Sequence, residues 1–323
     1  MTAPDLPPDP TGVPASRCEL TLSLFNYQGG GLQPDGSHRL GNLIAAFAEP
    51  PVPDVIALCE AKFWHRRGRR PFCTAINQLS AALGRPYVGE LFTGPLGTAI
   101  IYDPTVLRLS AGEEPEFDDK RNLARFSLRQ HPDTALHVYV EHWSHHNSDQ
   151  RLARARLLAQ YGTSTTPTLI AGDLNSTSSG PHLPVPFWGH QPPGRLDYQY
   201  RPQPDGTWTP DTRAVDRLIG TWHDPEPAEP AVPGRRNGAG FHHLAEHDPQ
   251  AARPFPPTGD NGLHIDYLLA NTALLQTAQV VPGSYRVHLP DGFPPPRYSD
   301  HRRISCTLAL TTDSSADQAS PPA

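Results

Sequence analysis

The 323-residue sequence has few lysines, one methionine and four cysteines. Lys62 and Lys120 are the only lysines among 27 basic residues, and the net charge is −6. A protein that coats nucleic acid usually carries a basic excess, so we expect any contact with nucleic acid to be local and transient. The cysteines form no CxxC pair, which argues against a zinc site or a disulfide framework. They favour free thiols in a reducing compartment, and we expect a cytoplasmic protein.

Long hydrophobic runs are also missing. No stretch approaches the ~18 apolar residues that a membrane-spanning helix needs, so no contact with a membrane is expected. The segment 1–17 has neither a basic start nor an apolar stretch, which argues against a signal peptide. Nothing in the sequence points to an obligate protein partner.

Proline, in contrast, is abundant and unevenly placed. It makes up 39 of 323 residues, and sixteen of these lie in 176–260. Such a density excludes long helices and central strands from that segment. We therefore predict a disordered tail over 1–17, one domain over 18–311 with a proline-rich insertion at 176–260, and a second disordered tail over 312–323.

The remaining segments alternate between strand and helix patterns, which predicts a layered α/β domain. Pro71 at a first helical position and Gly84 at a C-cap mark one helix. The residues Arg151 and Arg154 are expected on the exposed face of another. The predicted strands are 18–25, 54–58, 98–102, 124–129, 136–142, 168–171, 264–270 and 303–310, and the predicted helices are 41–48, 72–83, 149–161 and 212–222.

A polar residue stands at the end of nearly every apolar strand. Strand ends that meet at one edge of a sheet are where open α/β proteins place their chemistry. Each residue alone could be a turn or capping residue, but the ordered set is hard to reach by chance. The set is Asn26, Glu60, His142, Asp173, Asn175, Asp266, Asp300 and His301.

These residue types suit hydrolysis of a phosphoester. Oxygen ligands from Asn26, Glu60 and Asp300 are the kind that Mg²⁺ or Mn²⁺ prefers. A histidine can transfer protons near neutral pH, and a neighbouring carboxylate can fix its tautomer. A metal ion, an acid/base pair and hydrogen-bond donors together describe metal-assisted attack of water on phosphorus.

The segments that carry this set resemble the endonuclease/exonuclease/phosphatase superfamily, the DNase I-like fold. They are LSLFNYQGGG, PDVIALCE, GTAIIYD, ALHVYVEHW, TLIAGDLN, HIDYLLAN and YSDHRRI, and the last three are the most specific. The resemblance covers roughly residues 19–310. It implies a four-layer sandwich of two packed β-sheets with helices on the outer faces.

The resemblance also assigns roles to the residues. Asn26 and Glu60 match the residues that bind the divalent metal, with Asp300 as a further ligand. His301 matches the histidine at the scissile phosphate and Asp266 its orienting partner. The residues that match the water-activating and phosphate-contacting positions are Asp173 and Asn175, and His142 matches a second histidine of the DNase I type.

Substrate identity is open at this point. A basic loop follows Glu60 and is either a contact for a phosphate backbone or a solvated surface; its arginines are Arg66, Arg67, Arg69 and Arg70. The spacing of His243 and His247 allows a metal pair, but we interpret the segment as a loop. A nuclease-type phosphodiesterase fits best. A phosphatase or phosphodiesterase of a small metabolite or lipid headgroup is the alternative, and a non-catalytic binding module is the alternative of another class.

Overall fold

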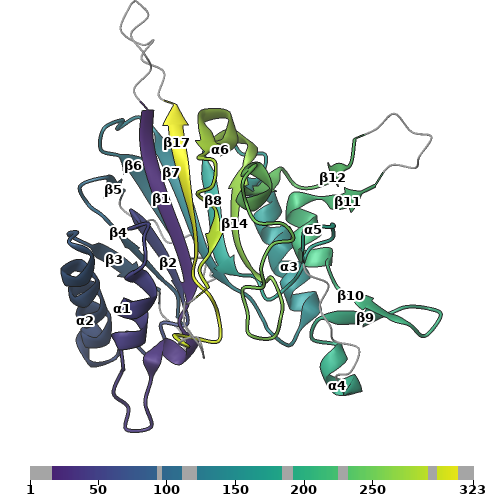
Figure 1. Cartoon of the computed structure of the whole chain (residues 1–323), viewed down its shortest axis with the longest axis horizontal. Coiled ribbons are helices and arrows are strands. Elements are labelled where there is room, and N and C mark those ends of the chain that lie inside the picture. The colour runs from purple at the N-terminus through teal and green to yellow at the C-terminus, as the bar shows by residue number, and fades with distance from the viewer. Residues whose placement is uncertain are drawn as a thin grey trace, which may run out of the picture.

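Two β-sheets pack face to face, and helices cover their outer faces (Figure 1). The computed structural model describes residues 17–92, 97–110, 122–183, 192–224, 232–289 and 297–311. The first sheet has the order β15-β17-β1-β2-β4-β3, with β16 paired to β17. Its strands are β1 (Arg17–Asn26), β2 (Val55–Cys59), β3 (Val88–Leu91), β4 (Ala99–Tyr102), β15 (Ala278–Val280), β16 (Arg286–Val287) and β17 (Ile304–Thr311).

The second sheet has the order β13-β14-β8-β7-β6-β5. Its strands are β5 (Leu107–Leu109), β6 (Asn122–Leu128), β7 (Ala135–His142), β8 (Thr168–Asp173), β13 (Phe241–His243) and β14 (Asp266–Asn271). The helices are α1 (Gly41–Phe47), α2 (Arg66–Leu83), α3 (Ser148–Leu158), α4 (Pro193–Leu196), α5 (Arg213–Ile219) and α6 (Thr272–Thr277). The two sheets and outer helices confirm the predicted sandwich.

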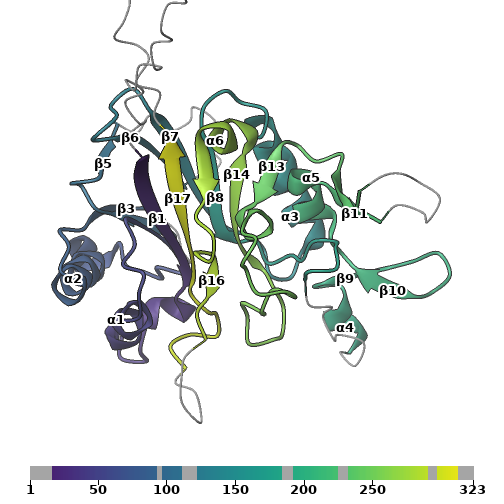
Figure 2. The same ribbon diagram turned by 45° about the horizontal axis from the view of Figure 1, so that its top comes forward.

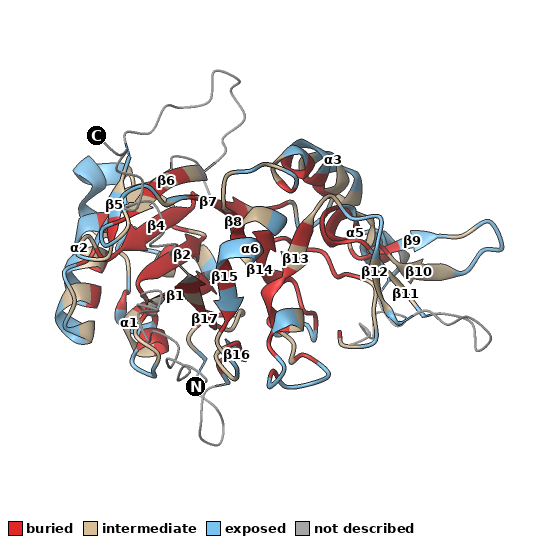
Figure 3. Ribbon diagram, turned by 90° about the horizontal axis from the view of Figure 1, so that it is seen from above, coloured by how far each residue is buried: buried red, intermediate tan, exposed pale blue. Residues whose placement is uncertain are grey.

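Three apolar clusters hold the layers together. The inner faces of both sheets form the central core, where residues such as Leu24 and Val138 are fully buried. Helices α1 and α2 pack on the outer face of the first sheet around Trp64, and α3 and α5 pack on the second sheet around Tyr267. Figure 3 shows the buried strands between helices whose outer sides are exposed. Burial on both faces explains why β2 and β8 read as continuous apolar runs.

The pairing register decides where the strand ends meet. β1 runs parallel to β2, and Asn26 lies opposite Cys59, the residue before Glu60. β7 runs parallel to β8, and β14 runs antiparallel to it, so that His142 and Asp266 both lie opposite Asp173. The polar residues therefore gather at one edge of the sandwich.

Most predicted elements are confirmed with shifts of one or two residues at their ends. The helix at Pro71 is assigned as Arg66–Leu83, but Arg67, Gly68 and Arg69 have left-handed backbone angles, and the regular helix starts after them. It ends at Gly84, which is left-handed, as expected for its C-cap. The helix predicted over 212–222 is shorter, Arg213–Ile219, because Gly220 breaks the helical backbone with φ 92°.

The proline-rich insertion is more regular than the sequence suggested. Its described part contains the hairpins β9 (Tyr200–Pro202) with β10 (Trp208–Pro210) and β11 (Thr221–His223) with β12 (Gly234–Arg236). The β9–β10 hairpin extends beyond α3 and α5 (Figure 2). The segment with His243 and His247 is not a loop: His243 ends β13, an edge strand of the second sheet, and a 3₁₀ helix (Leu244–His247) follows.

The predicted tails 1–17 and 312–323 lie outside the described residues, apart from Arg17, which begins β1. The division into one domain with two tails stays a prediction. Within the described ranges, no helix combines the length and the apolar character needed to cross a lipid bilayer.

Candidate active site

Asp173, at the end of β8, lies at the centre of the gathered polar residues. Its Oδ2 accepts a hydrogen bond from Asn26 Nδ2 at 2.9 Å and lies 3.6 Å from Nε2 of both His142 and His301. Its Oδ1 accepts the backbone N–H of Asn175 at 2.9 Å. Asp173 is 1% exposed, and burial raises the pKa of its carboxyl group. A buried carboxylate with a raised pKa is well suited to accept a proton.

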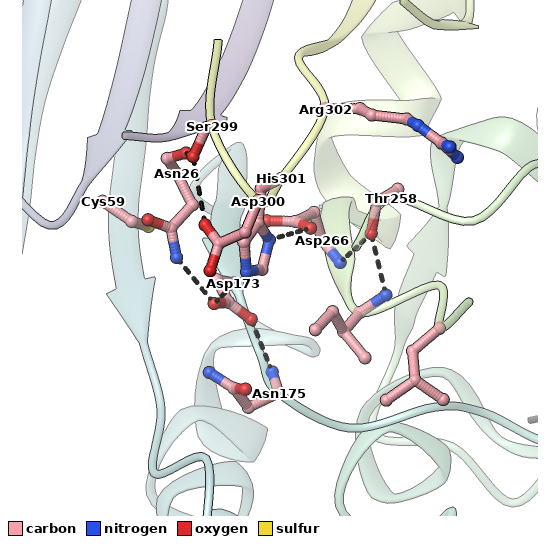
Figure 4. A network of polar contacts seen from close by, with 12 residues as sticks. Asn26, Cys59, Asp173, Asn175, Thr258, Asp266, Ser299, Asp300, His301 and Arg302 are labelled. Carbon is pink, nitrogen blue, oxygen red and sulfur yellow. Dashed lines mark hydrogen bonds and ion pairs between the residues drawn. The ribbon is translucent and has the colours of Figure 1, made fainter. Parts of the chain in front are cut away.

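His301 and Asp266 form a hydrogen-bonded pair beside Asp173 (Figure 4). Nδ1 of His301 and Oδ2 of Asp266 are 2.8 Å apart. Burial disfavours the imidazolium, but the carboxylates of Asp266 and Asp173 outweigh it and raise the pKa of His301 to about 10. At neutral pH the ring therefore carries a proton on both nitrogens. Nε2 of a charged histidine can donate to a phosphoryl oxygen or protonate a leaving group.

Glu60 follows β2 in a left-handed conformation, with φ 59°. This turn brings its carboxylate to the end of β1, where Oε2 accepts the backbone N–H of Gly29 at 2.6 Å and Oε1 accepts Asn26 Nδ2 at 3.3 Å. Oε1 also lies 4.0 Å from His142 Nε2. A non-glycine residue at positive φ costs about 1–3 kcal/mol, and such residues cluster at functional sites.

Asp300 joins the site through its neighbour Ser299. The Ser299 hydroxyl donates to the backbone carbonyl of Asn26 at 2.7 Å and contacts Asp300 Oδ1 at 3.2 Å. It also accepts the backbone N–H of Gln28 at 3.0 Å. Ser299 thus ties the segment before β17 to the end of β1, next to Asn26 (Figure 4).

Asn175 has a left-handed backbone, φ 47°, and is buried. Its Nδ2 donates to the carbonyl of Trp143 at 3.1 Å, and its carbonyl accepts the side chain of Gln199 at 3.0 Å. Its backbone N–H is the group that holds Asp173. Asn175 therefore fixes the position of the Asp173 carboxylate through its Oδ1 atom.

The four arginines of the predicted substrate loop are exposed and lie at the start of α2. Arg66 stacks on Phe63, with its guanidinium carbon 3.8 Å from the ring centre. These arginines, Arg66, Arg67, Arg69 and Arg70, make no hydrogen bond with the catalytic set among the described residues. They flank the site in sequence and stay a predicted contact.

Arg151 is buried and Arg154 is only 17% exposed, contrary to the expectation of an exposed helix face. Arg151 is 0% exposed and donates to the carbonyls of Ser144 and Tyr198. Arg154 binds the buried carboxylate of Glu141 at 2.8 Å. The ion pair with the buried Glu141 offsets the usual preference of the Arg154 guanidinium for solvent, and the two carbonyls do the same for Arg151.

Thr258 is a supporting residue that sequence reasoning missed. Its hydroxyl accepts the backbone N–H groups of Ile265 and Asp266, at 3.0 and 3.1 Å, and thereby fixes the start of β14. Thr258 and Gln199 both belong to the proline-rich insertion. A threonine in a proline-rich run carries no sequence signal for such a role.

Within the part of the chain that the structure describes, two groups of side chains could hold a metal ion. Ligand atoms of Asp173, Asp266 and His301 lie within 4.8 Å of one another. However, Nδ1 of His301 already binds Asp266, and a protonated imidazole has no free lone pair for a metal. The second group is Asn26, Glu60 and Asp300. Oδ1 of Asn26 is buried and has no hydrogen-bond partner among the described residues, which fits a ligand atom.

The fold and the site together define a phosphoester hydrolase of the two-sheet sandwich type. The profile of the Endonuclease/Exonuclease/phosphatase family matches residues 24–301, and the chain belongs to this family. No curated protein matches the chain closely enough to count as a relative.

Solved structures share the fold at low sequence identity. An endonuclease/exonuclease/phosphatase family protein from Bacteroides thetaiotaomicron is 14% identical with a TM-score of 0.53, over 91% of this chain and 99% of its own. ANGEL2, a 2′,3′-cyclic phosphatase, is 16% identical with a TM-score of 0.55, over 92% and 97%. TDP2 from D. rerio, solved with a single-strand DNA product, is 13% identical with a TM-score of 0.53, over 90% and 98%.

Proposed function

We propose that the protein hydrolyses phosphodiester bonds with the help of Mg²⁺ or Mn²⁺, by in-line attack of water. The observation that carries this proposal is the position of Asp173, whose carboxylate faces Asn26, His142 and His301 within 3.6 Å. A proton acceptor and a protonated donor thus lie side by side at one edge of the sandwich. This arrangement can remove a proton from water while it stabilises charge on a phosphate.

Each catalytic side chain then has a task. Asp173, together with His142, orients the attacking water and takes its proton. His301, held by Asp266, donates from Nε2 to the phosphoryl oxygens and to the leaving group. Asn175 positions Asp173 through its backbone and reaches the phosphate through the second hydrogen of its amide.

The metal ligands in this proposal are Asn26 Oδ1 and the carboxylates of Glu60 and Asp300. The unpartnered Oδ1 and the all-oxygen donor set suit Mg²⁺ or Mn²⁺. When bound, such an ion supplies positive charge that stabilises the pentacovalent phosphate. Glu60 is also fixed by Gly29, so its carboxylate is oriented before a ligand binds.

A nuclease-type substrate, bound transiently, is the one we favour because the exposed arginines of the loop after Glu60 can contact a phosphate backbone. The net charge of −6 disfavours binding of a long nucleic acid, so a small phosphorylated metabolite or a lipid headgroup is the second candidate substrate. The four cysteines are free thiols, which supports a reducing compartment such as the cytoplasm.

Hydrolysis of bis-p-nitrophenyl phosphate tests the reaction. We expect activity that depends on Mg²⁺ or Mn²⁺ and is lost in Glu60→Gln and His301→Ala. Glu19→Gln, an exposed carboxylate on β1, serves as the matched control and should leave the rate unchanged. Full activity in both site variants would refute the site, and no activity in the wild-type protein would favour a binding module.

Substrate class is tested by two parallel assays. Nicking of a plasmid reports a nuclease, and release of inorganic phosphate from a panel of phosphorylated metabolites reports a phosphatase. Nicking without phosphate release supports the proposal. Phosphate release without nicking would overturn the substrate assignment.

A further inference from the structure

Three aromatic rings gather on the surface beside the candidate active site. His145 and His146 lie in the loop between β7 and α3, and Tyr198 lies in the insertion between α4 and β9. The ring centroids of His145 and His146 are 4.6 Å apart, and each lies 6.3 Å from that of Tyr198. These are the distances of aromatic rings in direct contact. We call the three rings the aromatic platform.

The rings of the aromatic platform are open to a ligand. Both histidines are exposed, and Tyr198 is half-buried. Among the described residues, the two imidazoles make ring contacts within the platform and no hydrogen bond. Partial burial and the charges of His146 and His142 lower the pKa of His145, so its ring is uncharged at neutral pH. An uncharged exposed ring suits a stacking partner better than an anion.

The loop that carries the two histidines is joined to the catalytic residues. The backbone N–H of Trp143, at its start, donates to the carbonyl of Asp173 at 2.9 Å. The carbonyl of Trp143 accepts Nδ2 of Asn175 at 3.1 Å. The carboxylate of Asp173 also acts electrostatically on the imidazole of His145. A group that stacks on the platform is therefore a neighbour of the phosphate that reacts at Asp173.

Two buried side chains hold the platform in place. Arg151 donates from Nη1 to the carbonyl of Ser144 at 2.9 Å and from Nη2 to the carbonyl of Tyr198 at 2.5 Å. Gln199 donates to the carbonyl of Asn175 at 3.0 Å. These bonds join the histidine loop, the insertion and the catalytic residues, which are far apart in the sequence. The rings are thus oriented before a ligand binds, and this reduces the entropy that binding costs.

A recess of about 480 Å³ borders the platform at His146. Its volume lies in the range of small-molecule sites. The charges of its lining are balanced, with Arg201 and Arg213 on one side of the balance and Asp149 and Asp197 on the other. Arg213 is already paired with Asp149 at 3.1 Å. Such a lining disfavours a second anion and suits the edge of an uncharged ring that carries both hydrogen-bond donors and acceptors.

We propose that the aromatic platform binds the nucleobase next to the scissile phosphate, by stacking on the rings of His145, His146 and Tyr198, with the polar edge of the base toward the recess. The inference deepens the proposed function and rests on it for the position of the phosphate. It narrows the substrate to a phosphodiester that contains a nucleotide. Because every base has a π-face, we expect no strong preference among the bases.

Binding tests the platform without turnover. Calorimetry with thymidylate and with deoxyribose phosphate, in the Glu60→Gln background and with chelator present, measures what the base adds apart from metal and catalysis. We expect thymidylate to bind about tenfold more tightly or better. The double variant His145→Ala, Tyr198→Ala should remove this preference, whereas Tyr198→Phe, which keeps the ring, should preserve it. His247→Ala is the matched control, because it removes an exposed imidazole whose centroid lies 5.3 Å from that of His242, outside the platform.

A further variant covers the case in which the Tyr198→Ala change prevents folding. His145→Ala combined with His146→Ala removes only exposed rings. A reduced preference for thymidylate in this variant, with the His247→Ala control unchanged, supports the platform. Equal affinity of the Glu60→Gln protein for the two compounds, no measurable binding of thymidylate, or a full preference in the platform variants overturns it.

Turnover tests whether the bound base belongs to the substrate. The wild-type protein should hydrolyse the p-nitrophenyl diester of thymidylate with a higher kcat/KM than methyl p-nitrophenyl phosphate. The platform variants should reduce this ratio mainly through KM, because stacking binds the substrate and the transition state alike. An unchanged ratio, with the preference in binding lost, would make the nucleotide a separate ligand and overturn the substrate assignment. If the wild-type protein hydrolyses no diester, the proposed function fails, while the binding result still decides the platform.

Discussion

Replacing Asp266 by Asn tests whether the His301–Asp266 pair works as a proton donor. The variant keeps the size of the side chain but removes the charge that lies 2.8 Å from His301 Nδ1. The difference between a pKa of about 10 and the ordinary 6.5 corresponds to a net stabilisation of the imidazolium by about 5 kcal/mol, and the neighbouring charges supply more than this because they also offset the cost of burial. Asp266 is the strongest of the attractive charges, ahead of Asp173 and Asp300.

We expect two effects in a pH profile of bis-p-nitrophenyl phosphate hydrolysis. In the wild-type protein kcat falls on the alkaline side near pH 10, where His301 loses its proton. In Asp266→Asn this fall moves to lower pH by about two units or more, and kcat at its best pH drops about 10²–10⁴-fold. Asp54→Asn is the control: it removes a buried carboxylate at the opposite end of β2, paired with Arg85, and should leave the alkaline limb in place.

The same profile separates the pair from a metal site. If Asp173, Asp266 and His301 held the ion, His301 would be a neutral ligand, and Asp266→Asn would weaken metal binding. Activity would then return at higher metal concentration with an unchanged alkaline limb. That result would refute the assignment of His301 as a protonated donor.

Three further predictions concern stability and substrate contact. His264 is buried, and burial lowers its pKa to about 4, so its neutral form stabilises the fold above pH 6.5 and this contribution is lost as pH falls toward 4. In urea unfolding, His264→Asn should therefore reduce the loss of stability over that range by about 3 kcal/mol, while the buried His243 and His288 still contribute to it. The exposed control His146→Asn should leave the loss unchanged. Thr258→Val leaves two buried N–H groups without an acceptor and should lower the free energy of unfolding by about 2 kcal/mol or more, whereas Thr258→Ser should lower it less; equal values would contradict the role of the hydroxyl. Replacing all four loop arginines by alanine should reduce the dependence of single-strand DNA affinity on salt concentration. An unchanged dependence would show that the loop is a solvated surface without a role in binding.

The edge of the sandwich that carries the site could be predicted because the sequence shows where each strand ends. Apolar runs that end in a polar residue, as before Asn26 and Asp173, give both the strand and the position of its functional end. Parallel pairing of β1 with β2 and of β7 with β8 then brings these ends to one edge. The short edge strands such as β13 gave no such signal, since three residues are too few to show a period.

The left-handed turn at Glu60 could not be predicted, because the sequence around it has no glycine. Turn rules assign positive φ to Gly or Asn. Here the conformation is held instead by contacts made after folding, with the Glu60 carboxylate bound to Gly29 and Asn26. Those partners lie more than thirty residues away, so no local pattern contains the information.

The burial of individual arginines could not be predicted from the sequence either. The sequence treats Arg151, Arg154 and Arg303 alike, as charges that prefer water. The structure separates them by what surrounds each guanidinium: Arg154 faces the carboxylate of Glu141, while Arg303 retains two donors with no partner among the described residues. A paired buried charge is stabilised by its partner, whereas the buried guanidinium of Arg303 is held by the carbonyl of Glu49 and the ring of Phe47. The distinction therefore depends on tertiary contacts alone, and no local pattern in the sequence separates these arginines from one another.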